Sequence, residues 1–221
     1  AHCYERALLS KSCDHLVIAT PDNEIMNWAL KYQIPSVLTS NKHERATERA
    51  AEVLAILESK KSFFDHVLLL QGDEPQINPI DIQKLKHAFK DFHADVINLI
   101  FPISGNDISD PNVVKAIVSK SNKIKFFTRA HAPYQSQKGI RQLGMIGFTS
   151  EALKTYMNLE MTDLEILESI DMMRFLENDI NIQGVYSSSP ILGVDIPSDI
   201  KKVEHLMSDD SFLNQYQSKY L

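Results

Sequence analysis

The stretch His66-Val-Leu-Leu-Leu-Gln-Gly-Asp-Glu-Pro75 decides how the rest of this chain is interpreted. A short apolar run that ends in turn residues predicts a strand with both faces buried, here over residues 66–70. Gly72 lets the backbone approach a ligand closely, and Pro75 prevents the strand from continuing. Because open α/β sheets bind ligands at the carboxyl ends of their strands, the loop over residues 71–75 is a candidate site.

Strands and helices alternate on both sides of this loop. Helices are expected from the start to about Ser12 and over residues 24–32, 47–57, 81–92, 164–176 and 200–206. Strands are expected over residues 15–20, 36–39, 66–70, 95–102, 113–118, 123–128, 143–148, 180–186 and 191–194. This order predicts an α/β fold with a mixed, mostly parallel sheet and helices on both faces. No repeat or low-complexity linker interrupts it, so residues 1–221 are expected to form a single domain.

The composition is that of an ordinary globular protein. Apolar residues make up 43% of the 221 residues, charged residues 24%, and the formal net charge is −6. No basic run is present, which argues against a duplex nucleic-acid partner, although local cations could still bind a small anion. Cys3 and Cys13 are too few for a disulfide framework and predict reduced thiols in a cytoplasmic protein. The apolar runs are too short to cross a membrane.

Two carboxylate motifs follow predicted strands that are far apart in the sequence. Asp73 and Glu74 follow the first, and Asp195 follows the second in Gly-Val-Asp-Ile-Pro, residues 193–197. Mg²⁺ usually binds through one or two carboxylates together with substrate phosphates, so Asp73 and Asp195 are candidate metal ligands. A solvated turn at Asp73 and a helix cap at Asp195 are the alternatives, although Ser198 or Asp199 would cap that helix equally well.

Two further windows carry candidate binding residues. Arg129 ends a predicted strand and offers a planar fork for a carboxylate or phosphate, whereas a solvated surface arginine is the alternative. His131 nearby is a single histidine, which is more often structural than catalytic. Thr47 and Arg49 lie at the start of a predicted helix, where free N–H groups attract anions. A capping threonine on an amphipathic surface is the alternative there.

Five motifs in order along nearly the whole chain resemble the 3-deoxy-manno-octulosonate (KDO) cytidylyltransferase family. They are Gln-Gly-Asp-Glu-Pro at 71–75, Asp-Pro-Asn-Val-Val-Lys at 110–115, Phe-Thr-Arg-Ala at 127–130 with Pro133 and Tyr134, Leu-Glu-x-x-Glu at 164–168, and Gly-Val-Asp-x-Pro at 193–197. The resemblance implies a nucleotide-diphospho-sugar transferase type of fold, usually homodimeric. It also implies transfer of CMP from CTP to KDO with Mg²⁺, which releases pyrophosphate and supplies a lipopolysaccharide precursor.

The resemblance assigns roles to particular positions. Asp73 and Asp195 would hold Mg²⁺ and, with Arg129, form the catalytic set. The sugar-acid pocket would be lined by Gln71, Gln142, Glu168, Tyr134 and Arg129. Thr47 and Arg49 would lie near the cytidine.

The chain also departs from the family pattern. The family's first strand and its Arg/Gly/Lys loop, which wraps the triphosphate, have no counterpart here. The chain begins inside a predicted helix, so we expect that a preceding segment has been removed. The family's His-x-Gly reads Gln142-Leu-Gly144, and its Ser-Gly-Thr reads Arg45-Ala-Thr47. Glutamine can hydrogen-bond a hydroxyl but cannot carry a charge.

Three alternatives therefore stay open. The first is the same chemistry on another acid, such as 8-amino-KDO or a nonulosonic acid. The second is a non-catalytic binding paralogue. The third is an NAD-dependent enzyme, which is disfavoured because no Gly-x-Gly-x-x-Gly follows a strand.

Overall fold

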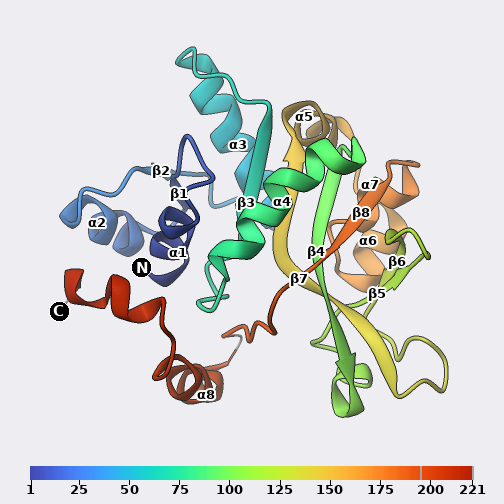
Figure 1. The fold of residues 1–221 in the computed structure, drawn as a ribbon. Helices are drawn as coiled ribbons and strands as arrows, with labels where there is room; N and C mark the ends of the chain where they lie inside the picture. Colours follow the sequence, from blue (N-terminus) through green and yellow to red (C-terminus); the bar gives the residue numbers. More distant parts are fainter. Residues whose placement is uncertain (195, 221) are drawn as a thin grey trace.

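The structure is a computed structural model that describes residues 1–194 and 196–220. Its helices are α1 (His2–Ser10), α2 (Asn23–Lys31), α3 (Ala46–Ser59), α4 (Pro79–Phe92), α5 (Ser150–Asn158), α6 (Asp163–Glu168), α7 (Met173–Glu177) and α8 (Pro197–Met207). Its strands are β1 (Ile18–Thr20), β2 (Ser36–Leu38), β3 (His66–Leu70), β4 (Val96–Ser104), β5 (Lys115–Val118), β6 (Lys123–Thr128), β7 (Lys138–Thr149) and β8 (Ile182–Tyr186). Figure 1 shows the arrangement, in which the two chain ends lie on the same side.

The strands form two sheets. One has the order β3-β7-β4-β8-β6-β5, and the other pairs β1 with β2. Pairing is parallel for β1–β2 and β4–β8, whereas β7 runs against β3 and β4, and β6 runs against β8 and β5. The expected mixed α/β class is confirmed. Within the six-stranded sheet, β7 and β6 each run antiparallel to both of their neighbours. Strands that point the same way are therefore paired directly less often than in the mostly parallel sheet that the sequence predicted.

Strand β4 is central and divides its side chains between two cores. Val96 and Ile100 enter the core under α3, α5 and α7, whereas Ile97 and Leu99 enter the core under α1 and α4. This division follows from the alternation of side chains along a strand. The expected helices on both faces are therefore confirmed.

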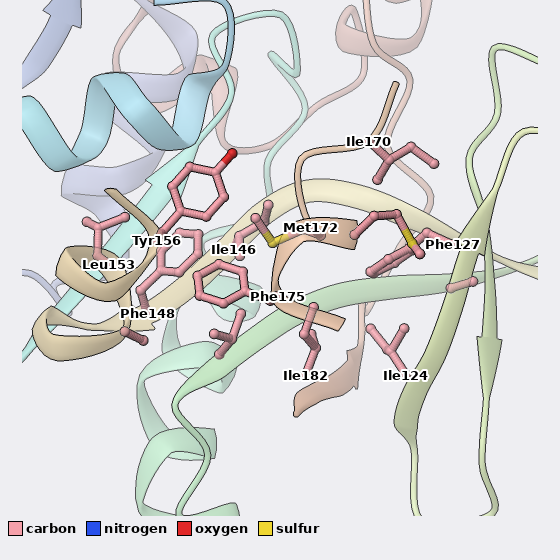
Figure 2. Packing of buried hydrophobic residues seen from close by; sticks show 14 of the residues in the cluster. Ile124, Phe127, Ile146, Phe148, Leu153, Tyr156, Ile170, Met172, Phe175 and Ile182 are labelled. Atoms are coloured by element: carbon pink, nitrogen blue, oxygen red, sulfur yellow. The ribbon is translucent and has the colours of Figure 1, made fainter. Parts of the chain in front are cut away.

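Aromatic rings fill much of the first core. The ring of Phe175 lies 6.0 Å from that of Phe148 and 5.3 Å from that of Tyr156, measured between centroids (Figure 2). Buried rings contribute both area and favourable ring geometry, so this core anchors α5 and α7 to β7.

Side-chain caps explain where several helices begin. The carboxylate of Asp22 accepts from the N–H of Glu24 at α2, and Asn78 accepts from Ile80 at α4. Thr149 accepts from Ala152 at the start of α5, a helix that the periodicity did not predict. These short polar side chains satisfy donors that the first turn of a helix leaves open.

Two predicted elements were wrong. The single helix over residues 164–176 is broken into α6 and α7, because Ser169 ends α6 with a left-handed φ of 54°. Residues 191–194 do not form a strand; instead the N–H of Val194 donates to the carbonyl of Asp73 at 2.8 Å. The backbone of this apolar run is therefore hydrogen-bonded to the loop after β3 and is not paired in a sheet. In the described chain no helix is long and apolar enough to cross a membrane.

Candidate active site

A cavity of about 1350 Å³ lies between β1 and β3. Both strands line it, and they belong to different sheets, so two sheet edges face each other across it. Gln71, Gly72 and Asp73 line the cavity at the carboxyl end of β3, and Arg49 lines it from α3. The loop singled out from the sequence therefore borders this cavity.

The loop over residues 71–75 is held by backbone and carboxylate contacts to β7. The N–H of Gln71 donates to the carbonyl of Gly144 at 3.1 Å, and Glu74 Oε1 accepts from the N–H of Gly144 at 2.8 Å. A Cβ on Gly144 would lie 2.7 Å from the side chain of Gln71, so an alanine here would displace that side chain. Glu74 is buried, whereas Asp73 is exposed beside it. The carboxylate of Glu74 is thus directed inward and holds the loop to β7, whereas the carboxylate of Asp73 lies at the surface.

Strand β7 is irregular where it meets this loop. Asn98 pairs with Ile146 and Ile100 pairs with Gln142. Strand β7 therefore bulges, with residues 143–145 opposite the single residue Leu99 of β4. Asn98 is fully buried, and its Nδ2 donates to the carbonyls of Leu99 at 3.0 Å, Leu143 at 2.9 Å and Met145 at 3.4 Å. Its Oδ1 accepts from Gln142 Nε2 at 2.6 Å. One carboxamide therefore fills a gap in the ladder and holds Gln142.

Arg129 and Glu168 form a second group. Glu168 accepts from the Thr128 hydroxyl at 2.9 Å and from the Arg129 N–H at 2.8 Å. The Arg129 guanidinium donates to three carbonyls, those of Glu168 at 2.9 Å, Pro111 at 3.0 Å and Ser169 at 3.4 Å. These contacts fix the guanidinium plane, and its remaining N–H groups can still meet a ligand.

Lys115 supports this group, although we did not select it from the sequence. It is fully buried, and its Nζ donates to the carbonyls of Asp110 at 2.8 Å and Arg129 at 2.7 Å. Burial lowers the pKa of its ammonium. Its place at the end of the Asp-Pro-Asn-Val-Val-Lys motif was the available signal, but the motif does not reveal which carbonyls the lysine reaches.

The two predicted nucleotide-binding residues, Thr47 and Arg49, have different surroundings. The Thr47 hydroxyl is buried and donates to Asp171 Oδ2 at 2.6 Å, so it is used inside the protein. Arg49 donates to the Thr39 hydroxyl at 2.6 Å and to the Ser40 carbonyl at 3.2 Å while it lines the cavity. Arg49 alone of the two is therefore placed to meet a ligand there.

The remaining candidates are placed less centrally. Tyr134 is 87% exposed, and its hydroxyl accepts from Gln135 at 3.3 Å. His131 contacts the Ser109 hydroxyl and the Ser136 carbonyl, each at 3.0 Å, which fits a structural role. Asp195 lies outside the described residues.

The candidates thus fall into two groups joined through the sheet. Gln71 and Glu74 of the loop that carries Asp73 contact Gly144, and Gln142 lies two residues before Gly144 on β7. The N–H of Gln142 donates to the Val114 carbonyl at 2.9 Å. Val114 directly precedes Lys115, which holds Arg129. The predicted sugar-acid residues therefore lie along one connected path, except Tyr134.

A thiol also contacts the loop. Cys3 Sγ donates to the carbonyls of Gly72 at 3.4 Å and Gln71 at 3.5 Å. Burial raises the pKa of this thiol to about 11. It is therefore protonated near neutral pH and acts as a weak donor rather than as a nucleophile.

A magnesium ion requires hard oxygen ligands, and Asp73 is the candidate to supply one in the described part of the chain. In the chain as described, no group of three or more His, Cys, Asp and Glu side chains could hold a metal by itself. Asp73, however, supplies an exposed carboxylate at the cavity. Because Mg²⁺ usually takes one or two carboxylates and completes its shell with phosphates and water, this chemistry fits a metal that arrives with a nucleotide.

The fold and the acidic loop at the cavity define a nucleotidyltransferase-type α/β protein. The family model described as cytidylyltransferase matches residues 1–182, so the chain belongs to the cytidylyltransferase family. The resemblance stated from the motifs is thereby confirmed.

Individual relatives agree. The 3-deoxy-manno-octulosonate cytidylyltransferase of Thermodesulfovibrio yellowstonii is 30% identical over 94% of this chain and 87% of its own length. The protein of the same name from Nitratiruptor sp. is 32% identical over 91% of this chain and 86% of its own. A solved structure of CMP:2-keto-3-deoxy-manno-octonic acid synthetase complexed with CTP matches with a TM-score of 0.86 at 28% identity, covering 95% of this chain and 87% of the other.

Proposed function

We propose that this protein transfers CMP from CTP to 3-deoxy-manno-octulosonate and releases pyrophosphate, which supplies an activated sugar acid for lipopolysaccharide synthesis. The position of Asp73, exposed on the loop after β3 and lining the large cavity, carries the proposal. Membership of the cytidylyltransferase family, and relatives named for this reaction, support it.

The reaction is a direct displacement. The anomeric hydroxyl oxygen of the sugar acid bonds to the α-phosphorus of CTP, the bond to pyrophosphate breaks, and the hydroxyl proton is released to water. Positioning and charge neutralisation supply the rate, because phosphoryl and nucleotidyl transfer needs little covalent help from protein groups. Arg129 would attract the sugar carboxylate, and Gln71 and Gln142 would orient its hydroxyls. Arg49 would meet the nucleotide from α3.

Asp73 would hold Mg²⁺ together with the CTP phosphates, and Asp195 is proposed as its second ligand from the sequence motif. When bound, the ion neutralises phosphate charge and lowers the pKa of a coordinated hydroxyl.

We also propose that the protein works in the cytoplasm as a homodimer. Free Cys3 and Cys13 fit a reducing compartment. Ile166 and Leu167 of α6 are 56% and 78% exposed, which is an apolar pair that a second copy could cover. Light scattering coupled to size-exclusion chromatography tests the dimer, and a monomer at micromolar concentration would contradict it.

The test of the reaction is pyrophosphate release by the full-length protein with CTP, Mg²⁺ and KDO. We expect release only when CTP and the acid are both present. Asp73→Asn should lower kcat by at least about tenfold, or about 1.4 kcal/mol. Lys84→Gln on α4 is the matched control, because its Nζ reaches Asp81 and the Tyr186 carbonyl rather than the cavity. A smaller fall in Asp73→Asn would remove Asp73 from the metal site.

The same chemistry on another sugar acid is the second candidate, favoured by Gln142 at the position where the family pattern has histidine. An 8-amino analogue and a nonulosonic acid in the same assay separate these substrates. A folded protein that releases no pyrophosphate with any acid would instead indicate a binding paralogue.

A further inference from the structure

The orientation of the Asn98 carboxamide is fixed by its surroundings. One end of the group faces three backbone carbonyls, those of Leu99, Leu143 and Met145, at 2.9–3.4 Å. Carbonyl oxygens can only accept, so the NH₂ group must occupy that end. The reversed amide would place four oxygens together in a fully buried site, where unsatisfied acceptors are costly.

This orientation fixes the next amide as well. With its NH₂ group turned to the bulge, Asn98 presents Oδ1 to Gln142. An amide oxygen cannot donate, so the Gln142 atom at 2.6 Å must be Nε2. The order of bonds from backbone to Asn98 to Gln142 therefore has one direction, although amide oxygen and nitrogen atoms are otherwise hard to tell apart.

The consequence is that the Gln142 carboxamide oxygen, Oε1, stays available as an acceptor. Gln142 is half-buried, and no hydrogen bond within residues 1–194 and 196–220 engages its Oε1. The side chain of Gln71 lies over Gly144, two residues further along β7, so both amides belong to the same region of the site. A ligand that reaches Gln142 meets this oxygen while its nitrogen is held by Asn98.

We propose that Asn98 is a positioning residue that turns the Gln142 carboxamide oxygen toward the sugar acid, so that this position selects a ligand group that donates a hydrogen bond, a hydroxyl or an ammonium. The inference rests on the proposed function, because it assigns Gln142 to the sugar-acid pocket. A group that only accepts, such as a methoxy, leaves two acceptors facing each other. A carboxamide has no charge, so the selection should not change between about pH 5 and 8, where a histidine would titrate.

The experiment compares KDO analogues in which each hydroxyl in turn becomes methoxy, together with the 8-amino analogue. The ratio of kcat/KM for the parent acid to that for each analogue is measured in the full-length protein, in Gln142→Met and in Asn98→Ala. Gln183→Ala is the matched control, because Gln183 is also a buried carboxamide that donates to backbone carbonyls, those of Ser121 at 3.1 Å and Gly184 at 3.2 Å.

We expect one position at which the unaltered protein disfavours methoxy by at least about tenfold, or about 1.4 kcal/mol. That ratio should fall toward one in Gln142→Met, mainly through KM. It should also fall in Asn98→Ala, because the released carboxamide can turn its NH₂ group to the methoxy oxygen. Gln183→Ala should keep the original ratio. Should Asn98→Ala fail to fold, Gln142→Met and the pH independence of the ratio decide the matter.

The contrary outcomes are distinct. No pyrophosphate release with any acid overturns the proposed function, and this inference with it. An active protein whose methoxy ratios are unchanged in Gln142→Met overturns the inference alone. A ratio that falls in Gln142→Met but persists in folded Asn98→Ala removes the positioning role of Asn98. Preference for the 8-amino analogue that depends on Gln142 identifies the donor as an ammonium, and equal dependence with KDO identifies it as a hydroxyl.

Discussion

Arg174→Met should destabilise the protein strongly, because it removes one member of a buried ion pair. Arg174 Nε donates to Glu165 Oε2 at 2.6 Å, and Arg174 Nη2 donates to Glu165 Oε1 at 2.7 Å. The two side chains are 6% and 0% exposed. The guanidinium carbon also lies 4.0 Å from the centroid of the Tyr156 ring. Glu165 would keep a buried charge after the substitution.

The magnitude follows from this arrangement. Removal of one partner from a buried pair costs about 3–5 kcal/mol, whereas replacement of both by apolar residues is often neutral or better. At about 2–4 °C per kcal/mol for a chain of this length, Arg174→Met should lower the Tm by roughly 6–20 °C. The double variant Arg174→Met/Glu165→Met should be more stable than Arg174→Met, because the fully buried Glu165 carboxylate is removed together with its partner. Arg45 and Glu48, which lie 4.0 and 3.6 Å from the pair, keep partly exposed side chains.

Urea unfolding followed by circular dichroism measures the free energies of unfolding for the double-mutant cycle. Lys154→Met is the matched control, since Lys154 pairs with Glu58 and Glu151 while 42% exposed, and exposed pairs contribute about 0–1 kcal/mol. A double variant that loses the sum of the two single losses would refute the reasoning, because the pair would then show no coupling.

Three further predictions concern single positions. Gly144→Ala should raise KM for the sugar acid several-fold by displacing Gln71, while stability changes by only about 1 kcal/mol because that side chain can rotate. Steady-state kinetics and urea unfolding measure the two quantities, and an unchanged KM with a large loss of stability would contradict the prediction. Desolvation raises the pKa of Asp171 above 3.8, so the stability present below that pH is lost as pH rises through the folded pKa. Asp171→Asn should therefore gain stability relative to the unaltered protein from about pH 4 upward, and a difference that is constant in urea midpoints across pH would contradict this. Because burial raises the pKa of Cys3 to about 11, Ellman's reagent should modify exposed Cys13 well before Cys3, and equal rates in Cys13→Ser and the unaltered protein would contradict it.

Elements that depend on local sequence were predicted well. The strands His66–Leu70 and Lys123–Thr128 have the predicted bounds, because a short run of suitable residues between turn residues specifies them. The helix over residues 164–176 was not, since its apolar periodicity continues across Ser169, where the backbone turns left-handed. Thr149 with Glu151 was a capping signal for α5 that the periodicity alone did not reveal.

The candidate site divides in the same way. Asp73 and Gln71 follow a recognisable strand and could be selected from the sequence. Asn98 could not, because its partners Leu143 and Gln142 are 45 and 44 residues away, and only the folded sheet brings them together. The buried role of Thr47 likewise depends on Asp171, 124 residues further on.

The central position of β4 has a consequence for the order of folding. Its neighbours are β7, which it meets at Phe148 from Val96, and β8, which it meets at Ile182. Both pairings close long loops, and the chain loses the entropy of loop closure before either core is complete. Such non-local pairing slows folding. During synthesis β4, which ends at Ser104, must wait for β8, which begins at Ile182, before its second edge is covered. Until then, an apolar edge is available to other chains, and we expect low temperature or slow expression to favour the yield of folded protein.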